Sequence, residues 1–535
     1  MDKAHLRMAN ALLALKEVFG FDAFRPFQHE CLSAVFAKQD LFAVTATGGG
    51  KSLIFQIPAL VFPNPVVVIS PLISLMADQV SKMRAIGVRA VRLSSDIPRS
   101  EHAPWDTLKD QDLIYVSPEK LATPGFQKAL RGVRLGMIAL DEAHVAVTWG
   151  KDFRSSYAHL RGFVDQHPEA VRFACTATAD DEVETGIRAM MGLRDPKRIV
   201  TSPWRTNIDY IVRKEAGFSE LVDRLAAAQA QPGSQIVYVS SRRTAEELAQ
   251  RLRDAGLDVA HYHAGMNPLI RTQVQNRFMA GAIRCVVATN AFGMGVDKPD
   301  IRLIAHWHMP SSLFNYLQET GRASRDGLPA TAWLNIGKDA EKTHNFFIEC
   351  SNPEFYVYQR LWAFLTAAER QPVRVPTAIL ARASGVSERM QGQIDAALAY
   401  LEYTGHIRSA GVGFAYELPI INKRVAESVV RTIRGARISK NAVHYEPPDG
   451  ETDHHMRFIT SGACRFVEPS EIVSVDLLRQ DLQLTANDVG EKKRGAKMKL
   501  LMLHRFADST DRRGFVEALF SQRETPVQEQ AGVPA

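Results

Sequence analysis

The chain has 535 residues, of which 46% are hydrophobic and 23% charged, and its formal net charge is +6 at pH 7. This length allows three or four domains with sizeable cores, and the composition is that of a globular protein. The sequence contains no apolar run of transmembrane length and starts without the apolar segment of a signal peptide, so we expect no membrane span and no secretion. The five cysteines form no Cys-x-x-Cys pair, which argues against disulfides and a zinc knuckle and predicts a cytoplasmic protein.

Apolar segments of strand length alternate with helical segments over the first two thirds of the chain. In the first part, strands are expected at residues 41–44, 66–69, 113–116 and 137–140. The pattern restarts after Trp204, with strands expected at residues 235–239, 285–288 and 303–306. Apolar strands separated by helices are typical of parallel sheets covered on both faces. We therefore predict an α/β fold with two tandem lobes, residues 1–205 and 206–345.

The pattern changes after about residue 350. Residues 376–419 have the features of a helix-turn-helix with Gly385 at the turn, followed by a glycine-containing hairpin at residues 409–416. These features predict a winged-helix-like domain at residues 346–420, whose wing is compatible either with separating a duplex or with packing against the core. Residues 421–535 are expected to form a partly helical C-terminal region with a disordered end.

A glycine-rich segment between the first expected strand and a helical segment has the pattern of a phosphate-binding loop. It reads Thr47-Gly48-Gly49-Gly50-Lys51-Ser52. In such a loop backbone N–H groups face the phosphates, the lysine reaches the β and γ oxygens, and the hydroxyl binds Mg²⁺. Thr45 stands where the strict pattern has glycine. The alternative is a glycine-rich turn with an incidental lysine.

Two acidic residues follow the apolar strand at residues 137–140. They begin the segment Asp141-Glu142-Ala143-His144. Asp141 is expected to hold Mg²⁺, mostly through water, and Glu142 to orient and deprotonate the attacking water. Together with the phosphate loop, this pair predicts ATP and Mg²⁺ as cofactors. Taken alone, the pair would fit a solvated acidic strand end equally well.

Two further segments are candidates for the same site. Upstream, residues 19–28 contain Gln28, whose amide can pair with adenine, beside aromatic and arginine side chains that can stack on it. In the second lobe, Gln318 begins a segment that contains Arg322 and Arg325. Their guanidinium groups can bind a γ-phosphate in a bidentate manner across a cleft between the lobes. Alternatively, the arginines pair with Glu319 and Asp326 on the surface.

Small hydroxyl and polar residues follow several of the expected strands, as is typical of loops that contact phosphates without reading sequence. The candidates of this kind are Ser70, Ser241, His263 and Thr289. Trp149 and Phe153 are expected to stack on unpaired bases, beside the cation Arg154. The alternative is that Trp149 belongs to the core.

These motifs, in this order, resemble superfamily 2 helicases, and two segments narrow the resemblance to the RecQ family of DNA helicases. The segments are Trp149-Gly150-Lys151-Asp152-Phe153-Arg154 and Phe292-Gly293-Met294-Gly295-Val296-Asp297-Lys298-Pro299. The resemblance covers about residues 10–345. It implies RecA-like lobes, 3′-to-5′ translocation on DNA, and coupling of DNA binding to hydrolysis through Arg154 and the aromatics. It also implies that Phe21, Arg25 and Gln28 surround adenine.

The sequence departs from this family pattern in three places. Lys151 stands where the family usually has histidine, and Ser324 where it usually has glycine. The third departure is the four-cysteine zinc module of bacterial members, which has no counterpart here, so we predict no zinc. The adjacent pair His454-His455 is interpreted as part of a solvated loop.

The resulting hypothesis is a 3′–5′ DNA helicase of DNA repair or recombination, associated with the nucleoid. Its expected partners are single-stranded DNA, branched or tailed duplexes, and repair proteins such as a single-strand-binding protein. Two alternatives remain open from the sequence. One is a non-unwinding remodeller or adaptor that hydrolyses ATP when DNA is bound. The other is an RNA helicase, because Asp-Glu-Ala-His boxes occur in that class as well.

Overall fold

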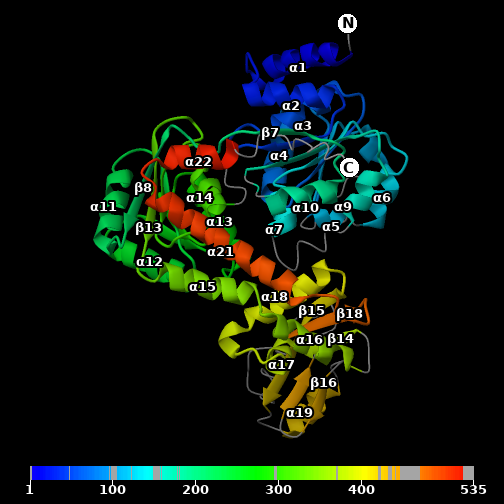
Figure 1. Ribbon diagram of the computed structural model, residues 1–535, viewed down its shortest axis with the longest axis vertical. Coiled ribbons are helices and arrows are strands. Elements are labelled where there is room, and N and C mark those ends of the chain that lie inside the picture. The colour runs from blue at the N-terminus through cyan, green and yellow to red at the C-terminus, as the bar shows by residue number, and fades with distance from the viewer. Residues whose placement is uncertain are drawn as a thin grey trace, which may run out of the picture. The chain divides into compact units, whose positions relative to one another are not determined.

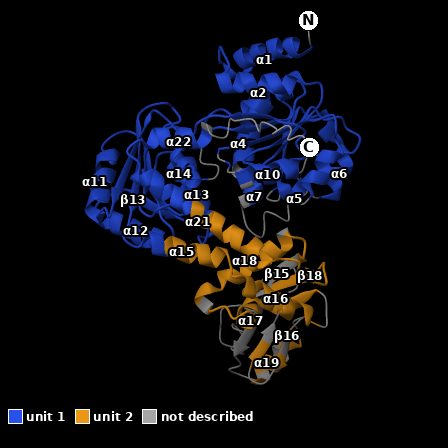
Figure 2. Cartoon of the chain, in the orientation of Figure 1, with its two compact units in different colours: residues 1–149, 156–342, 499–535 blue, residues 150–155, 343–498 orange. Residues whose placement is uncertain are grey.

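The computed structural model describes residues 3–46, 48–94, 97, 105–121, 123–148, 157, 159–177, 179, 181–293, 298–368, 372–419, 423–431, 436–439, 442–445 and 470–521. Two compact units are distinguished in Figure 2. The first comprises residues 1–149, 156–342 and 499–535, and the second comprises residues 150–155 and 343–498. Among the described helices, none combines the length and apolar character needed to cross a membrane.

The first lobe is built on a seven-stranded parallel sheet in the order β3-β4-β2-β5-β6-β1-β7. Its strands are β1 (Leu41–Val44), β2 (Val66–Ile69), β3 (Ala90–Leu93), β4 (Leu113–Val116), β5 (Met137–Leu140), β6 (Val171–Thr176) and β7 (Lys197–Val200). Every residue of β1, β2, β4, β5 and β6 is buried, as expected for strands covered on both faces. The four strands predicted in this lobe are confirmed with their bounds.

Helices cover this sheet and contribute to its core (Figure 1). They are α1 (Lys3–Phe19), α2 (Pro26–Phe36), α3 (Leu53–Val61), α4 (Ile73–Ala85), α5 (Pro118–Leu121), α6 (Pro124–Leu130), α7 (His144–Thr148), α9 (Leu160–Asp165) and α10 (Asp181–Met191), with a 3₁₀ segment at Trp105–Asp110.

The second lobe has a six-stranded parallel sheet in the order β10-β11-β9-β12-β13-β8. Its strands are β8 (Ile208–Lys214), β9 (Ser234–Tyr238), β10 (Val259–Tyr262), β11 (Cys285–Ala288), β12 (Ile301–His306) and β13 (Ala330–Ile336). Its helices include α11 (Phe218–Gln229), α12 (Arg242–Asp254), α13 (Pro268–Met279) and α14 (Leu313–Thr320). The predicted α/β fold with two tandem parallel-sheet lobes is therefore confirmed.

Two C-terminal helices complete the first unit. The 23-residue helix α21 (Ala486–Asp508) starts in the second unit, and its residues from 499 onward belong to the first unit together with α22 (Arg512–Ser521). Figure 1 shows α22 beside α14 of the second lobe. Ring centroids of Phe506 and Phe520 lie 5.5 Å from Tyr316 and 6.0 Å from Phe314, respectively. The chain end therefore packs on the second lobe.

The second unit contains a five-stranded antiparallel sheet in the order β14-β18-β15-β17-β16. Its elements are α15 (Ala340–Ser351), α16 (Phe355–Thr366), β14 (Val373–Pro376), α17 (Thr377–Ala383), a 3₁₀ segment at Glu388–Met390, α18 (Gly392–Tyr403), β15 (Ile407–Pro419), α19 (Lys423–Val430), β16 (Ala436–Ser439), β17 (Ala442–Tyr445) and β18 (Ser470–Leu477). Gly385, at φ +73°, lies in the connection between α17 and α18, which also contains the 3₁₀ segment, and the winged-helix assignment stays a prediction.

The predicted hairpin at residues 409–416 is wrong. These residues lie within the single 13-residue strand β15, in which a bulge between Ser409 and Gly411 absorbs an extra residue where a turn was expected. The pairing partners, β17 and β18, follow much later along the chain. The predicted boundary at residue 420 consequently falls inside one sheet.

Candidate nucleotide site

The loop between β1 and α3 requires its glycines. Gly48 and Gly50 both have φ +80°, a left-handed conformation that favours glycine. A Cβ at Gly49 would lie 2.8 Å from Thr45 Oγ1, and a Cβ at Gly50 would collide with the amide of Gln28. This tight turn leads directly into α3, the strand–loop–helix arrangement of a phosphate site. Thr47 lies outside the described residues.

Lys51 belongs to this loop, and its side chain lies near the acidic pair. Its side chain is 9% exposed, and Nζ donates a hydrogen bond to Thr45 O at 3.4 Å. The same Nζ is 3.9 Å from Glu142 Oε1. The lysine side chain is therefore held near the Glu142 carboxylate, whose charge it offsets.

Asp141 and Glu142 follow β5 and have opposite pKa shifts. Burial, followed by the charge of Glu142, raises the pKa of Asp141 to about 6. Burial would also raise the pKa of Glu142, but Lys51 and the other nearby cations lower it overall. Asp141 Oδ1 accepts hydrogen bonds from Glu142 N at 2.9 Å and from Cys175 Sγ at 3.3 Å. Glu142 has φ +46°, a strained conformation for a non-glycine residue of the kind that clusters at functional sites.

His144 links this acidic pair to the second lobe. Its Nδ1 is 2.9 Å from Thr176 Oγ1 and 3.5 Å from Glu142 Oε2, while its Nε2 is 3.3 Å from Gln318 Nε2. Burial lowers the pKa of His144, which favours the neutral ring. His144 was not predicted as a site residue, although it is the fourth residue of the 141–144 segment. Gln318 was predicted, and it contacts this histidine.

Arginines of the second lobe approach the phosphate loop of the first. A Cβ built on Gly48 would lie 3.6 Å from Arg325 Cγ and 3.7 Å from a terminal nitrogen of Arg205. Arg322 is 7% exposed and donates to Gly293 O. Arg322 and Arg325 are among the cations that lower the pKa of Glu142. The charges of both predicted arginines therefore act on the Glu142 carboxyl group.

The surface alternative for these arginines required pairing with Glu319 and Asp326. Glu319 Oε2 is instead 2.7 Å from His306 Nε2, and Asp326 Oδ1 accepts from Arg302 at 3.0 Å. Sequence reasoning missed Arg205, which lies in the connection between the lobes and donates to Ser324 O at 2.8 Å. An isolated arginine outside any motif carried no signal for this role.

The predicted adenine contacts lie next to the phosphate loop. Gln28 Nε2 donates to Gly50 O at 3.2 Å, and Gln28 Oε1 accepts from Arg25 N at 3.0 Å. The Arg25 guanidinium donates to Gly48 O at 3.1 Å. Phe21 is 55% exposed. Gln28 and Arg25 therefore brace the loop in this structure, and Phe21 is accessible for stacking.

The predicted nucleic-acid contacts that the structure describes all follow the carboxyl ends of strands. Ser70 is buried after β2, and its hydroxyl accepts from Leu72 N at 3.4 Å. Ser241 caps α12 by accepting from Thr244 N at 3.1 Å. His263 and Thr289 follow β10 and β11 and are both largely buried. Trp149, Lys151, Phe153 and Arg154 lie outside the described residues.

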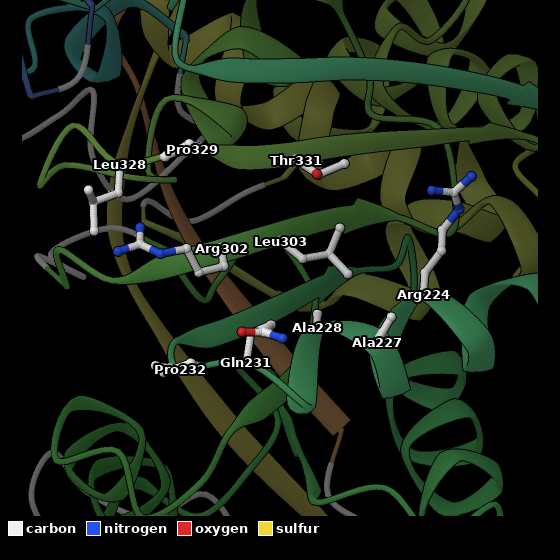
Figure 3. A pocket seen from close by; sticks show the side chains of 10 residues that line it. All are labelled: Arg224, Ala227, Ala228, Gln231, Pro232, Arg302, Leu303, Leu328, Pro329 and Thr331. Carbon is white, nitrogen blue, oxygen red and sulfur yellow. The ribbon is translucent and has the colours of Figure 1, made fainter.

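A cavity of about 610 Å³ in the second lobe lies apart from these residues (Figure 3). Arg302 and Leu303 of β12, Thr331 of β13 and Ala228 of α11 contribute to its lining. These strand residues lie near the amino ends of β12 and β13, whereas ligands of open α/β sheets bind at the carboxyl ends. No predicted site residue lines the cavity.

Comparisons with known proteins agree with this arrangement. Residues 25–185 match the DEAD/DEAH box helicase family, and residues 216–327 match the helicase conserved C-terminal domain. The ATP-dependent DNA helicase RecQ of Haemophilus influenzae is 42% identical over 327 residues, which are 61% of this chain and 53% of that protein. Over these residues the chain is similar to proteins named RecQ and carries the two helicase domains. RecQ of Bacillus subtilis is 35% identical over 354 residues, 65% of this chain and 59% of that protein.

These RecQ alignments span only about half to three fifths of each relative's length. Among solved structures, Saccharomyces cerevisiae Dbp5 bound to RNA and ADP BeF3 superposes with a TM-score of 0.51 at 15% identity, covering 63% of this chain and 90% of that one. This likeness shows that the RecQ-like part of the chain shares the two-lobe helicase fold.

Proposed function

We propose that this chain is an ATP-dependent DNA helicase that moves 3′ to 5′ along one strand and separates duplex DNA in repair or recombination. The observation that carries the proposal is the convergence of Lys51 and Glu142 from one lobe with Arg322 and Arg325 from the other. The similarity to proteins named ATP-dependent DNA helicase RecQ supports DNA as the substrate.

The residues of the site fit Mg-ATP. Gly48 and Gly50 adopt backbone conformations that favour glycine, and their lack of side chains leaves room for phosphates. Lys51 supplies the positive charge. Ser52 and Asp141 would hold Mg²⁺, which when bound neutralises charge on the phosphates. Glu142, kept ionised by its lowered pKa, would orient and deprotonate water, while Arg322 and Arg325 stabilise charge on the transferred phosphoryl group.

The coupling of hydrolysis to movement would use the contact between lobes. Closure of the lobes brings Arg325 to the phosphate loop, and opening withdraws it. DNA would lie along the loops of Ser70, Ser241, His263 and Thr289, with Trp149, Phe153 and Arg154 as further contacts. Single-stranded and tailed or branched DNA are the proposed substrates. A single-strand-binding protein is a proposed partner, and the nucleoid the proposed location.

The deciding experiment is ATP-dependent strand separation of a 3′-tailed duplex. Wild type should separate it, whereas Lys51→Ala should lose hydrolysis and separation but keep single-strand binding. Lys128→Ala, an exposed lysine of α6, is the matched control and should behave like wild type. A 5′-tailed duplex tests the polarity. Separation by Lys51→Ala at the wild-type rate would overturn the nucleotide-site assignment.

A second candidate function is an ATP-gated remodeller or adaptor that binds branched DNA without unwinding it. The departure at Lys151 and the lack of clustered cysteines in the sequence favour it. DNA-stimulated hydrolysis without separation of either tailed duplex would support this candidate. Stimulation by RNA oligomers in place of DNA would instead favour the RNA helicase alternative.

A further inference from the structure

Three potential metal ligands from two segments converge in the second lobe. They are Glu246 on α12, His261 on β10 and His263 immediately after β10. One ligand atom from each lies within 4.8 Å of the other two. None of these residues belongs to the nucleotide site or to the family's cysteine module.

The backbone explains why these side chains meet. Residues two apart on an extended segment point to the same side, which brings His261 and His263 together. Their rings lie 5.7 Å apart at an interplanar angle of 16°. Helix α12 packs on this strand, with Arg253 donating to Val259 O at 3.1 Å, and thereby presents Glu246 to the histidines.

The geometry around His263 favours its Nε2 as the ligand atom. Nε2 lies 2.9 Å from Glu246 Oε1, close to the separation of about 3.3 Å between two ligands of a tetrahedral zinc ion. A hydrogen bond alone would account for that pair, but not for the adjacent His261. The Nδ1 atom of His263 has no hydrogen-bond partner among the described residues. A Cβ built on Gly265 would lie 3.3 Å from this atom and 3.1 Å from a terminal nitrogen of Arg242, whose charge disfavours a cation there.

We propose that Glu246, His261 and His263 bind one divalent transition-metal ion, with zinc as the best match. Two imidazoles and one carboxylate select zinc and its neighbours over Mg²⁺ and Ca²⁺, which prefer oxygen ligands. Because Glu246 is 56% exposed, solvent can supply the fourth ligand. The prediction of no zinc rested on cysteine spacing, which carries no information about ligands on separate elements.

The bound ion would fasten α12 to the end of β10. His263 and Ser241 both lie at this junction, so the ion would order two of the loops assigned to DNA in the proposed function. Metal binding itself does not depend on that function. The result of the metal-binding test is therefore independent of the result of the helicase assay.

The experiment is a Co²⁺ titration of chelator-treated full-length protein, followed by the visible absorption of tetrahedral cobalt, with Zn²⁺ displacement at the end. All titrations use protein that carries Asp141→Asn, because this substitution removes Co²⁺ binding at the proposed nucleotide site. We expect one equivalent to bind, and His261→Ala and Glu246→Gln each to weaken binding by about 100-fold. His159→Ala, an exposed histidine of the first lobe, should leave binding unchanged.

Circular dichroism establishes that each variant is folded, and Glu246→Gln preserves side-chain shape if His261→Ala disturbs the strand. Equal binding by the Asp141→Asn parent and by its His261→Ala and Glu246→Gln derivatives would overturn the proposal, as would no tetrahedral absorption in the parent. Substantial Mg²⁺ competition for the cobalt signal would also overturn it, because it would identify an oxygen-ligand site.

Discussion

The proposed role of Asp141 as a Mg²⁺ ligand predicts that Mg²⁺ binding depends on pH. The pKa of Asp141 is raised to about 6 by burial and by Glu142, so the free protein takes up a proton there as the pH falls through this value. Only the carboxylate binds Mg²⁺, and the proton therefore competes with the ion. We expect the Mg²⁺ concentration for half-maximal ATP hydrolysis to rise steeply below about pH 6 and to level off above about pH 7.

Mg²⁺ titrations of the ATPase rate across this pH range measure the effect. High Mg²⁺ should restore turnover at low pH, because it displaces the proton from Asp141. A half-maximal Mg²⁺ concentration that does not change with pH would contradict the assigned role of this carboxylate.

Ser324 occupies a backbone conformation that suits glycine, the residue implied there by the family resemblance. It has φ +51°, is fully buried, and its hydroxyl accepts from Asn207 Nδ2 at 2.8 Å. Ser324→Ala loses this bond and keeps the backbone strain, whereas Ser324→Gly loses the bond but relieves the strain. We therefore expect the glycine variant to be more stable than the alanine variant by about 1 kcal/mol.

Thermal unfolding measures this difference, which corresponds to about 1 °C in a chain of this size. The same two substitutions at Ser81, an exposed residue within helix α4, provide the matched control. There the order should reverse, because alanine is the better helix former. An alanine variant at position 324 as stable as the glycine variant would contradict the strain at this residue.

Secondary-structure elements differ in how far their local sequence determines their structure. The strands β1, β2, β4 and β5 were predicted with their bounds because all four residues of each are apolar and buried on both faces. Strand β15 was not, because its partners β17 and β18 follow later in the chain, with paired residues up to 70 positions apart (Ile407 and Leu477). Pairing over such distances leaves no pattern in the local sequence. The two glycines Gly411 and Gly413, in contrast, resemble the glycines of a hairpin turn, which explains the wrong prediction.

The packing of α21 on the second lobe was likewise invisible in the sequence, and it leads to a prediction about stability. Phe506 is fully buried beside Tyr316 and Phe515. Phe506→Ala should destabilise the protein by about 3–5 kcal/mol, because it removes a large buried ring and leaves a cavity. Leu501→Ala, a 43% exposed position on the same helix, is the control and should have a small effect.

Calorimetry of the full chain tests this packing, with the transition of the second lobe expected to shift to lower temperature. Equal, small shifts for Phe506→Ala and Leu501→Ala would show that the chain end contributes little to the stability of this lobe.

At the scale of the whole first unit, the site depends on residues brought together from both lobes. The proximity of Lys51, Asp141 and Glu142 could be predicted because each belongs to a motif that follows an apolar strand. His144 and Arg205 could not, because their roles come from contacts with the other lobe, to Gln318 and Ser324. Sequence motifs identify side chains that are capable of catalysis. The contacts between lobes determine which of these side chains lie together.

Arg325 provides the most direct test of this assembly. It belongs to the second lobe, yet its side chain approaches Gly48 of the phosphate loop in the first. Arg325→Ala should reduce DNA-stimulated ATP turnover by about a thousandfold or more, because an arginine that stabilises phosphoryl transfer has an effect of this size. ATP affinity, measured with a fluorescent analogue, should change far less, because the glycine loop and Lys51 remain. Arg243→Ala, at an 87% exposed position of the same lobe, should retain turnover. Near-normal hydrolysis by Arg325→Ala would mean that the first lobe alone completes the chemistry, and the contact between lobes would then have to serve movement along DNA by some other route.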